Sequence, residues 1–426
     1  MKKASLIIEE LKTELYHSLL KEIYIDESLI AKQKIRYQSA VEKFISLYGD
    51  QEVDIYSTPG RSEVCGNHTD HQHGEVLAAA INLDIIAVVA PTDHVIKVLS
   101  DDYDIKGVDI HDLSKRDEEV ETSEGLIRGV CARYQELGYQ IGGFNAYMTS
   151  DVLQGSGLSS SAAFEVGVGT ILSGLYNEMA IDPVIIAQVG QYAENVYFGK
   201  PCGLMDQCAC SVGSLIHIDF KDNQHPVVEK IEVDFPEFKH SLCIVDVHAS
   251  HADLTNDYAS IPYEMKKVAK FFGKEFLRDV NEKEFYEKLP EVRIATNDRA
   301  VLRTIHLFEE NKRVEKAVSA LNDGDFDTFK NIIKASGESS FKYLQNIYSN
   351  NYTDKQAVSI ALALSEQILD SHGVCRVHGG GFAGTIQAFV EDEYVKIYQK
   401  EIEKYFGEGS CHVLKVRKYG GVKVIG

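Results

Sequence analysis

The chain has 426 residues, 44% of them hydrophobic and 26% charged, with a formal net charge of −21. This length exceeds what one hydrophobic core usually organises, so two domains are expected. The excess of acidic residues excludes nucleic acid or an anionic membrane as the main partner, because both require a basic surface. No apolar run is long enough for a membrane span or a signal peptide, and the eight cysteines are scattered without a Cys-x-x-Cys motif. A cytoplasmic protein with free thiols is expected.

Residues 1–50 are predicted to form an amphipathic helical extension. Apolar residues recur every three or four positions from Leu6 to Leu20 and again from Val41 to Leu47. The extension carries no catalytic motif, and we expect it to pack on the main body. A partner-binding helix is the alternative.

A dense polar segment, Arg61–Gly74, lies between two strand-like stretches. The first stretch is predicted to end at Pro59-Gly60, and the second is the apolar run 76–89. His68, Asp70, His71 and His73 fall within this segment. Their spacing matches neither a helical pair of ligands nor a zinc motif, so a pocket for substrate hydroxyls around Asp70 is favoured over a metal site.

The stretch from Asp151 to Val168 has the pattern of a phosphate-binding turn. Glycine, serine and glycine at 155–157 are followed by three serines and then by a helical run of small and apolar residues. Serine hydroxyls suit a helix N-terminus because they accept from unpaired N–H groups, and the same N–H groups and helix dipole suit a phosphate. A turn that only caps a buried helix is the alternative.

Carboxylates mark the next helices. Glu194 falls inside a helix that begins at Asp182-Pro183, and Asp206 opens another helix just after Gly203. An acid near a helix N-terminus is stabilised as the anion.

The remaining expectations are a helix at 124–137, a polar approach to a domain boundary at 221–240, a strand at 242–247, helices at 262–350 and 352–372, and a strand at 386–390 behind a second glycine-rich loop.

Three motifs in this order resemble the GHMP small-molecule kinase family, most closely the galactokinases. The similarity covers roughly residues 50–420 and includes two segments between the second and third motifs, Ala193-Glu194-Asn195 and Cys202–Gln207. The motifs are Pro59-Gly60-Arg61 with Gly66-Asn67-His68-Thr69-Asp70, then Gly155–Ala162, then Gly379–Gly384.

The resemblance implies an α+β fold with two domains and an active site in the cleft between them. Residues 1–50 would be an extension. Residues 51–235 would form the GHMP kinase N-terminal domain, which resembles domain 2 of ribosomal protein S5 and carries the sugar and ATP motifs. Residues 236–426 would form a ferredoxin-like C-terminal α+β domain, with its last strands packing back on the N-terminal domain.

The resemblance also implies roles for individual residues. Asp206 would face the anomeric hydroxyl of a sugar, with Arg61 beside it. Ser161 and Glu194 would coordinate Mg²⁺. The ATP phosphates would be held by Gly155, Ser156, Gly157, Leu158, Ser159, Ser160 and Ser161, and the sugar by Asn67, His68, Asp70, Gly203 and Tyr258.

The expected activity is ATP-dependent phosphorylation of the C1 hydroxyl of a hexose, with galactose as the first choice. The family's usual Gly-Glu-His-Thr-Asp-Tyr is here Gly-Asn-His-Thr-Asp-His, so Asn67 replaces a glutamate that contacts the 6-hydroxyl in galactokinases. A hexose modified at C6 or C2 is therefore an alternative substrate, and a weakly catalytic sensor of sugar and ATP is an alternative function. Retention of Arg61, Glu194 and Asp206 favours an enzyme.

Overall fold

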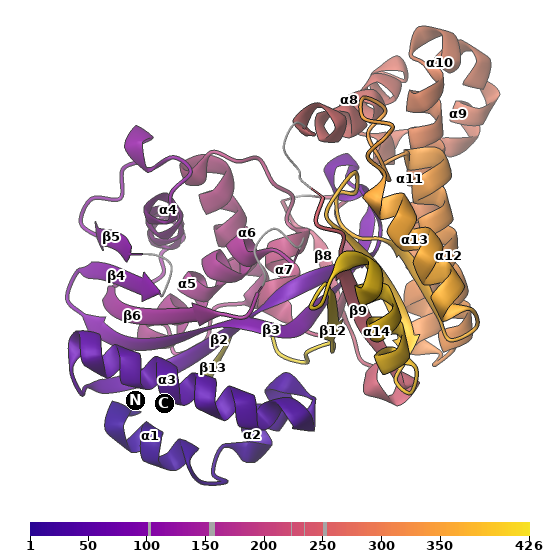
Figure 1. Ribbon diagram of the computed structural model, residues 1–426. Coiled ribbons are helices and arrows are strands. Elements are labelled where there is room, and N and C mark those ends of the chain that lie inside the picture. The colour runs from indigo at the N-terminus through magenta and orange to yellow at the C-terminus, as the bar shows by residue number, and fades with distance from the viewer. Residues whose placement is uncertain (101–103, 153–157, 223, 234, 250–253) are drawn as a thin grey trace.

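Two β-sheets organise the chain, and each gathers its own helices (Figure 1). The structure is a computed structural model that describes residues 1–426 except 101–103, 153–157, 223, 234 and 250–253. Within the described residues the strands form a nine-stranded mixed sheet and a four-stranded antiparallel sheet. We call the first sheet with its helices the N-terminal lobe and the second the C-terminal lobe.

Two long antiparallel strands, β2 (Glu52–Cys65) and β3 (Glu75–Thr92), form the spine of the larger sheet. The sequence predicted that the first of them would end at Pro59-Gly60, which is wrong. The strand continues because its register shifts between Pro59 and Arg61, so a bulge absorbs the bend. The other strands of this sheet are β1 (Lys2–Lys3), β4 (Val95–Ser100), β5 (Asp104–Asp109), β6 (Gly143–Ser150), β7 (Leu215–Asp219), β8 (Val227–Ile231) and β13 (Val422–Ile425).

Strand β8 lies within the polar segment 221–240, where the sequence predicted only the approach to a boundary. Three of its five residues are exposed or charged, so hydrophobic alternation gave little signal.

The larger sheet is buried on both faces. Ile86 and Val88 pack against the N-terminal helices, whereas Ile85 and Ala87 face the opposite cluster, as the two-residue period of a strand requires. The predicted helical extension is confirmed as α1 (Ala4–Leu11), α2 (His17–Tyr24) and α3 (Ile30–Tyr48). The other face is covered by α4 (Ser123–Glu136), α5 (Ser160–Tyr176), α6 (Pro183–Tyr192), the π-helix η4 (Ala193–Phe198) and α7 (Met205–Val212).

The smaller sheet has helices on both faces as well (Figure 1). Its strands are β9 (His240–Asp246), β10 (Gly373–Val377), β11 (Thr385–Glu391) and β12 (Cys411–Leu414), in the order β10-β11-β9-β12. The helices of this lobe are α8 (Thr255–Phe271), α9 (Glu282–Glu287), α10 (Leu289–Ala295), α11 (Asp298–Asn322), α12 (Phe326–Ser339), α13 (Ala357–Leu369) and α14 (Val395–Phe406).

A buried charge cluster joins the helical extension, the spine of the larger sheet and the end of the chain. Asp84 on β3 is fully buried between two arginines, with Arg36 at 2.6 Å and Arg417 at 3.1 Å. The hydroxyl of Tyr24 donates to the same carboxylate at 2.8 Å. Arg36 also lies 3.1 Å from Asp151, the residue that follows β6.

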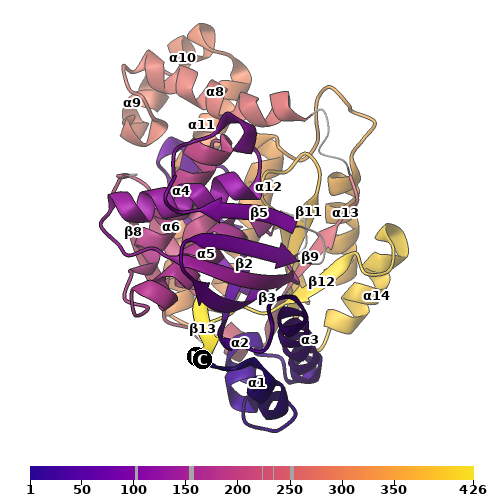
Figure 2. The same ribbon diagram turned by 90° about the vertical axis from the view of Figure 1, so that its left-hand side faces the viewer.

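The two ends of the chain meet at the larger sheet. The amino group of Met1 lies 3.2 Å from Asp54 on β2, and β13 pairs with the same strand (Figures 1 and 2). Within the described residues, no helix is both long and apolar enough to cross a bilayer.

Candidate active site

An arginine–aspartate pair lies where the bulge of β2 meets the start of α7. Arg61 follows the register shift, and Asp206 is the second residue of the helix. Arg61 Nε donates to Asp206 Oδ1 at 2.7 Å, and its second terminal nitrogen donates to Oδ2 at 2.6 Å. The pair is bidentate, which fixes the plane of the carboxylate. Arg61 is almost buried, while the Asp206 side chain keeps 31% of its surface exposed.

Asp206 is held as an anion. Burial alone would raise its pKa, but the charge of Arg61 and hydrogen bonds from Arg61 and Ser159 outweigh that effect and keep the pKa below its ordinary value. The carboxylate is therefore ionised at neutral pH and remains partly open to a reactant.

Ser159 joins this pair instead of capping the helix. It occupies the N-cap position of α5 with a left-handed backbone, φ 54°, and makes no side-chain cap hydrogen bond. Its hydroxyl donates to Asp206, so the expected capping role is wrong for this serine. The carbonyl of Leu158 accepts from the backbone N–H of Arg61 at 3.2 Å. Gly155, Ser156 and Gly157 lie outside the described residues, and Ser160 begins the helix.

The two residues expected to hold a metal lie together. The hydroxyl of Ser161 is 3.4 Å from Glu194 Oε1, and Lys200 Nζ lies 3.2 Å from the same oxygen. Glu194 is 3% exposed, and its other oxygen accepts from Gln207 at 2.9 Å. Hydroxyl and carboxylate oxygens are the ligands that Mg²⁺ prefers, so the chemistry of this pair suits that ion.

A second buried acid stands behind this pair. Glu165 on α5 is 1% exposed and accepts from Gln207 Nε2 at 3.2 Å, so one amide group touches both glutamates. Burial, and then repulsion from Glu194, raise the pKa of Glu165 well above its ordinary value. The sequence reading missed Glu165, although an acid in a helical run of small and apolar residues was a usable signal.

Gly203 lies against Asp70. A Cβ atom at Gly203 would stand 2.3 Å from Asp70 Oδ2, so any larger residue there would displace the Asp70 carboxylate. Burial raises the pKa of Asp70 to about 6, and the charges of Asp206 and Glu63 contribute in the same direction. Both residues belong to the predicted sugar set and are brought together from distant parts of the chain.

The second glycine-rich loop contacts two more residues of that set, His68 and Tyr258. His68 Nε2 lies 2.9 Å from the carbonyl of Gly380, and the hydroxyl of Tyr258 donates to the carbonyl of Gly381 at 2.8 Å. A Cβ atom at Gly380 would stand 2.6 Å from the Tyr258 ring. This loop therefore sets the positions of a histidine from the N-terminal lobe and a tyrosine from the C-terminal lobe.

Asn67 is fully buried, and its side-chain amide forms hydrogen bonds with other groups of the protein. Its Nδ2 donates to the carbonyl of Gly379 at 2.7 Å and to Glu63 at 3.2 Å, while its Oδ1 accepts from Asn346 at 2.8 Å. Glu63 in turn pairs with the fully buried Arg376 at 2.8 Å. The residue that replaces the family glutamate thus contacts the glycine loop and a buried ion pair.

His378 directly precedes the glycines of the second glycine-rich loop and is not among the residues predicted for the site. It is 2% exposed, with Nε2 3.0 Å from Ser62 Oγ and Nδ1 2.9 Å from Thr385 Oγ1. Burial, together with the neighbouring arginines 61 and 376, lowers its pKa to about 3. A neutral imidazole therefore lies near Arg61 without adding a competing positive charge.

Comparison with known proteins gives matches over most of the chain. The family model for the galactokinase galactose-binding signature matches residues 42–91, and that for the GHMP kinases N terminal domain matches residues 125–214. The galactokinase of Actinobacillus pleuropneumoniae serotype 3 (strain JL03) is 32% identical over 84% of this chain and 91% of its own length. The galactokinase of Glaesserella parasuis serovar 5 (strain SH0165) is also 32% identical, over 85% and 92%.

Solved structures share the fold. The Lactococcus lactis galactokinase complexed with galactose aligns with a TM-score of 0.75 at 23% identity, over 90% of this chain and 98% of that one. The Methanococcus jannaschii mevalonate kinase aligns with a TM-score of 0.60 at 17% identity, over 86% and 98%.

Proposed function

The chain belongs to the galactokinases within the GHMP kinase family, and from that premise we propose that it transfers the γ-phosphoryl group of ATP to the anomeric hydroxyl of galactose. The observation that carries the proposal is the ionised, partly exposed Asp206, held by Arg61 at the start of α7. Phosphoryl transfer needs positioning and charge stabilisation more than covalent help from the protein, and this pair supplies both.

In the proposed reaction Asp206 orients the C1 hydroxyl and accepts its proton. The hydroxyl oxygen forms a bond to the γ-phosphorus, the bond from that phosphorus to the bridging oxygen breaks, and ADP leaves. Arg61 keeps Asp206 anionic before transfer and offsets negative charge beside it. Residues 155–161 would bind the phosphates, and Ser161 and Glu194 would hold Mg²⁺. Bound Mg²⁺ would neutralise charge on the phosphate oxygens.

The test of this function is ADP release with a panel of sugars. We expect turnover with galactose, while 6-deoxygalactose and galactosamine test the alternative substrates modified at C6 and at C2. Turnover with a modified hexose alone would change the substrate and keep the reaction. No turnover with any sugar, while ATP still binds, would favour the alternative function as a sensor of sugar and ATP.

We also infer a cytoplasmic location, supported by the use of ATP and by the free thiols of all eight cysteines.

Replacing Gly203 by alanine is expected to raise the KM for galactose about 10- to 100-fold, with a smaller effect on the KM for ATP. The new methyl group would occupy the space of Asp70 Oδ2, and the side chain of Asp70 would have to turn away from the sugar. Steady-state kinetics of Gly203→Ala, Asp70→Asn and the double variant test this. If the two changes act through the same carboxylate, the double variant is no worse than Asp70→Asn alone, and fully additive losses would contradict the assignment.

Sugar binding is expected to weaken as the pH falls through about 6. Asp70 has its pKa raised to about 6 by burial and by neighbouring carboxylates, so it is ionised above that pH and protonated below it. A protonated carboxyl loses one acceptor for sugar hydroxyls. The measurement is kcat/KM for galactose against pH, with kcat/KM for ATP as internal reference. A galactose profile that stays flat between pH 7 and 5 would remove Asp70 from the sugar site.

A further inference from the structure

Two histidines and an aspartate meet at an edge of the larger sheet, far from the proposed active site. His94 stands in the turn before β4, Asp109 is the last residue of β5, and His111 follows it. Figure 1 shows β4 and β5 at the side of the N-terminal lobe that faces away from the C-terminal lobe. Within the described part of the chain, no other three histidine, cysteine or carboxylate side chains lie close enough together to share an ion.

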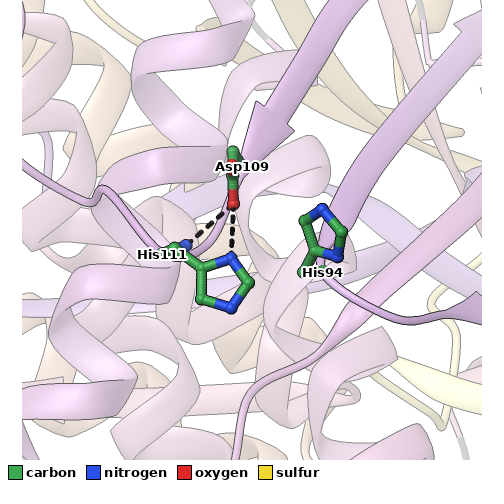
Figure 3. Close-up of side chains that lie close together, drawn as sticks. All are labelled: His94, Asp109 and His111. Atoms are coloured by element: carbon green, nitrogen blue, oxygen red, sulfur yellow. Dashed lines mark hydrogen bonds and ion pairs between the residues drawn. The ribbon is translucent and has the colours of Figure 1, made fainter.

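Strand pairing brings these residues together across 17 positions of sequence. Val95 is directly opposite Asp109 in the β4–β5 pair, and the N–H of Ile110 donates to the carbonyl of His94 at 3.0 Å. One nitrogen or oxygen atom from each of the three side chains lies within 4.8 Å of the others. The imidazole rings of His94 and His111 are 4.9 Å apart, and Figure 3 shows both rings beside the carboxylate of Asp109.

Asp109 also orients one of the histidines. Its Oδ1 accepts from the backbone N–H of His111 at 3.0 Å and lies 3.0 Å from Nδ1 of the same residue. This contact holds the exposed imidazole of His111 beside the Asp109 carboxylate, so both groups can turn toward a shared ion.

We propose that His94, Asp109 and His111 form a surface site for one divalent transition-metal ion such as Zn²⁺ or Ni²⁺. Two imidazoles and a carboxylate suit these ions, whereas Mg²⁺ prefers an all-oxygen shell and would favour Ser161 and Glu194. Ligand atoms around such an ion stand closer than 4.8 Å, so the rings must turn inward. All three side chains are exposed and can turn, and water completes the coordination.

The test is a calorimetric titration of the purified protein with Ni²⁺ or Zn²⁺ at neutral pH. We expect one ion per chain that is lost in the double variant His94→Ala/His111→Ala. Asp109→Asn should lower the affinity about 10- to 100-fold, because it removes the anionic ligand of the ion. Co²⁺ provides a second readout, since its visible absorption reports imidazole coordination in the wild type and should disappear in the double variant.

His372→Ala is the matched control, because His372 is also a half-exposed histidine paired with a carboxylate, Glu391, at 2.7 Å. This variant should bind the ion like the wild type. All variants should retain wild-type sugar kinase activity and circular dichroism, since the three residues lie on the surface away from Asp206. Equal stoichiometry and affinity in the wild type and the double variant, or no binding in the wild type, would overturn the proposal. A loss confined to His372→Ala would move the site to that histidine and overturn it as well.

Discussion

Asp206→Asn is expected to lower kcat by about 10²- to 10⁴-fold while ATP binds as in the wild type. The substitution keeps the shape of the side chain and removes the anion that Arg61 and Ser159 stabilise. An amide orients a hydroxyl poorly and cannot take its proton, and positioned general bases contribute effects of this size. ADP release measures kcat, and calorimetry with ATP measures binding in the absence of turnover.

Asp354→Asn is the control for that variant, because Asp354 is an exposed aspartate in the C-terminal lobe. It should behave like the wild type in both measurements. Turnover of Asp206→Asn within a few-fold of the wild type would show that Asp206 neither orients nor deprotonates the reacting hydroxyl. Loss of ATP binding with loss of turnover would instead point to a damaged phosphate site.

Asp84→Asn is expected to cost about 3–5 kcal/mol of stability, the usual penalty for breaking a buried ion pair on one side. Asp84 is fully buried, and its carboxylate offsets both Arg36 and Arg417. The neutral amide would leave two guanidinium groups close together with no anion between them. The midpoint of urea denaturation, followed by circular dichroism, gives the change in the free energy of unfolding.

The same cluster makes stability depend on pH in a defined direction. The pKa of Asp84 is lowered: burial opposes ionisation, but the two arginines and the hydroxyl of Ser57 outweigh it. The stability that Asp84 contributes is therefore present above the ordinary aspartate pKa. It is lost as the pH falls toward the lowered pKa of Asp84 in the folded protein. Arg293→Gln, which breaks a fully exposed pair with Asp298, should leave the urea midpoint nearly unchanged. Equal midpoints for Asp84→Asn and the wild type would contradict the assigned role of the cluster.

Short motifs made much of the fold and site predictable from sequence. The GHMP kinase fold predicted from three motifs is confirmed by the family models and by the aligned structures. Arg61 lies beside Asp206, as the resemblance implied, and Ser161 lies beside Glu194. The roles of these residues remain predictions. Local chemistry also placed the start of α6, where Asp182 accepts from the N–H of Val184 at 2.7 Å.

Features that depend on distant contacts were not predictable from one sequence. A proline and glycine usually end a strand, yet β2 passes through Pro59-Gly60 because a bulge there lets it pair with β3 on both sides. The sequence position of Ser159 is typical of a helix-capping residue, but its hydroxyl donates to Asp206, 47 positions away. The pairing of Asp84 with Arg417 spans 333 positions and leaves no periodic pattern in the sequence.

The position of β13 bears on how the protein is made. Arg417 and β13 are synthesised long after Asp84 and β2, yet they pair with that aspartate and with that strand. Until then, the nascent chain carries an unpaired stretch of β2 and a buried aspartate without one of its two arginines. Unpaired strand edges favour wrong association. A stop codon that removes Arg417 and β13 is therefore expected to yield chains that aggregate or are degraded, even though they contain every residue proposed here for catalysis.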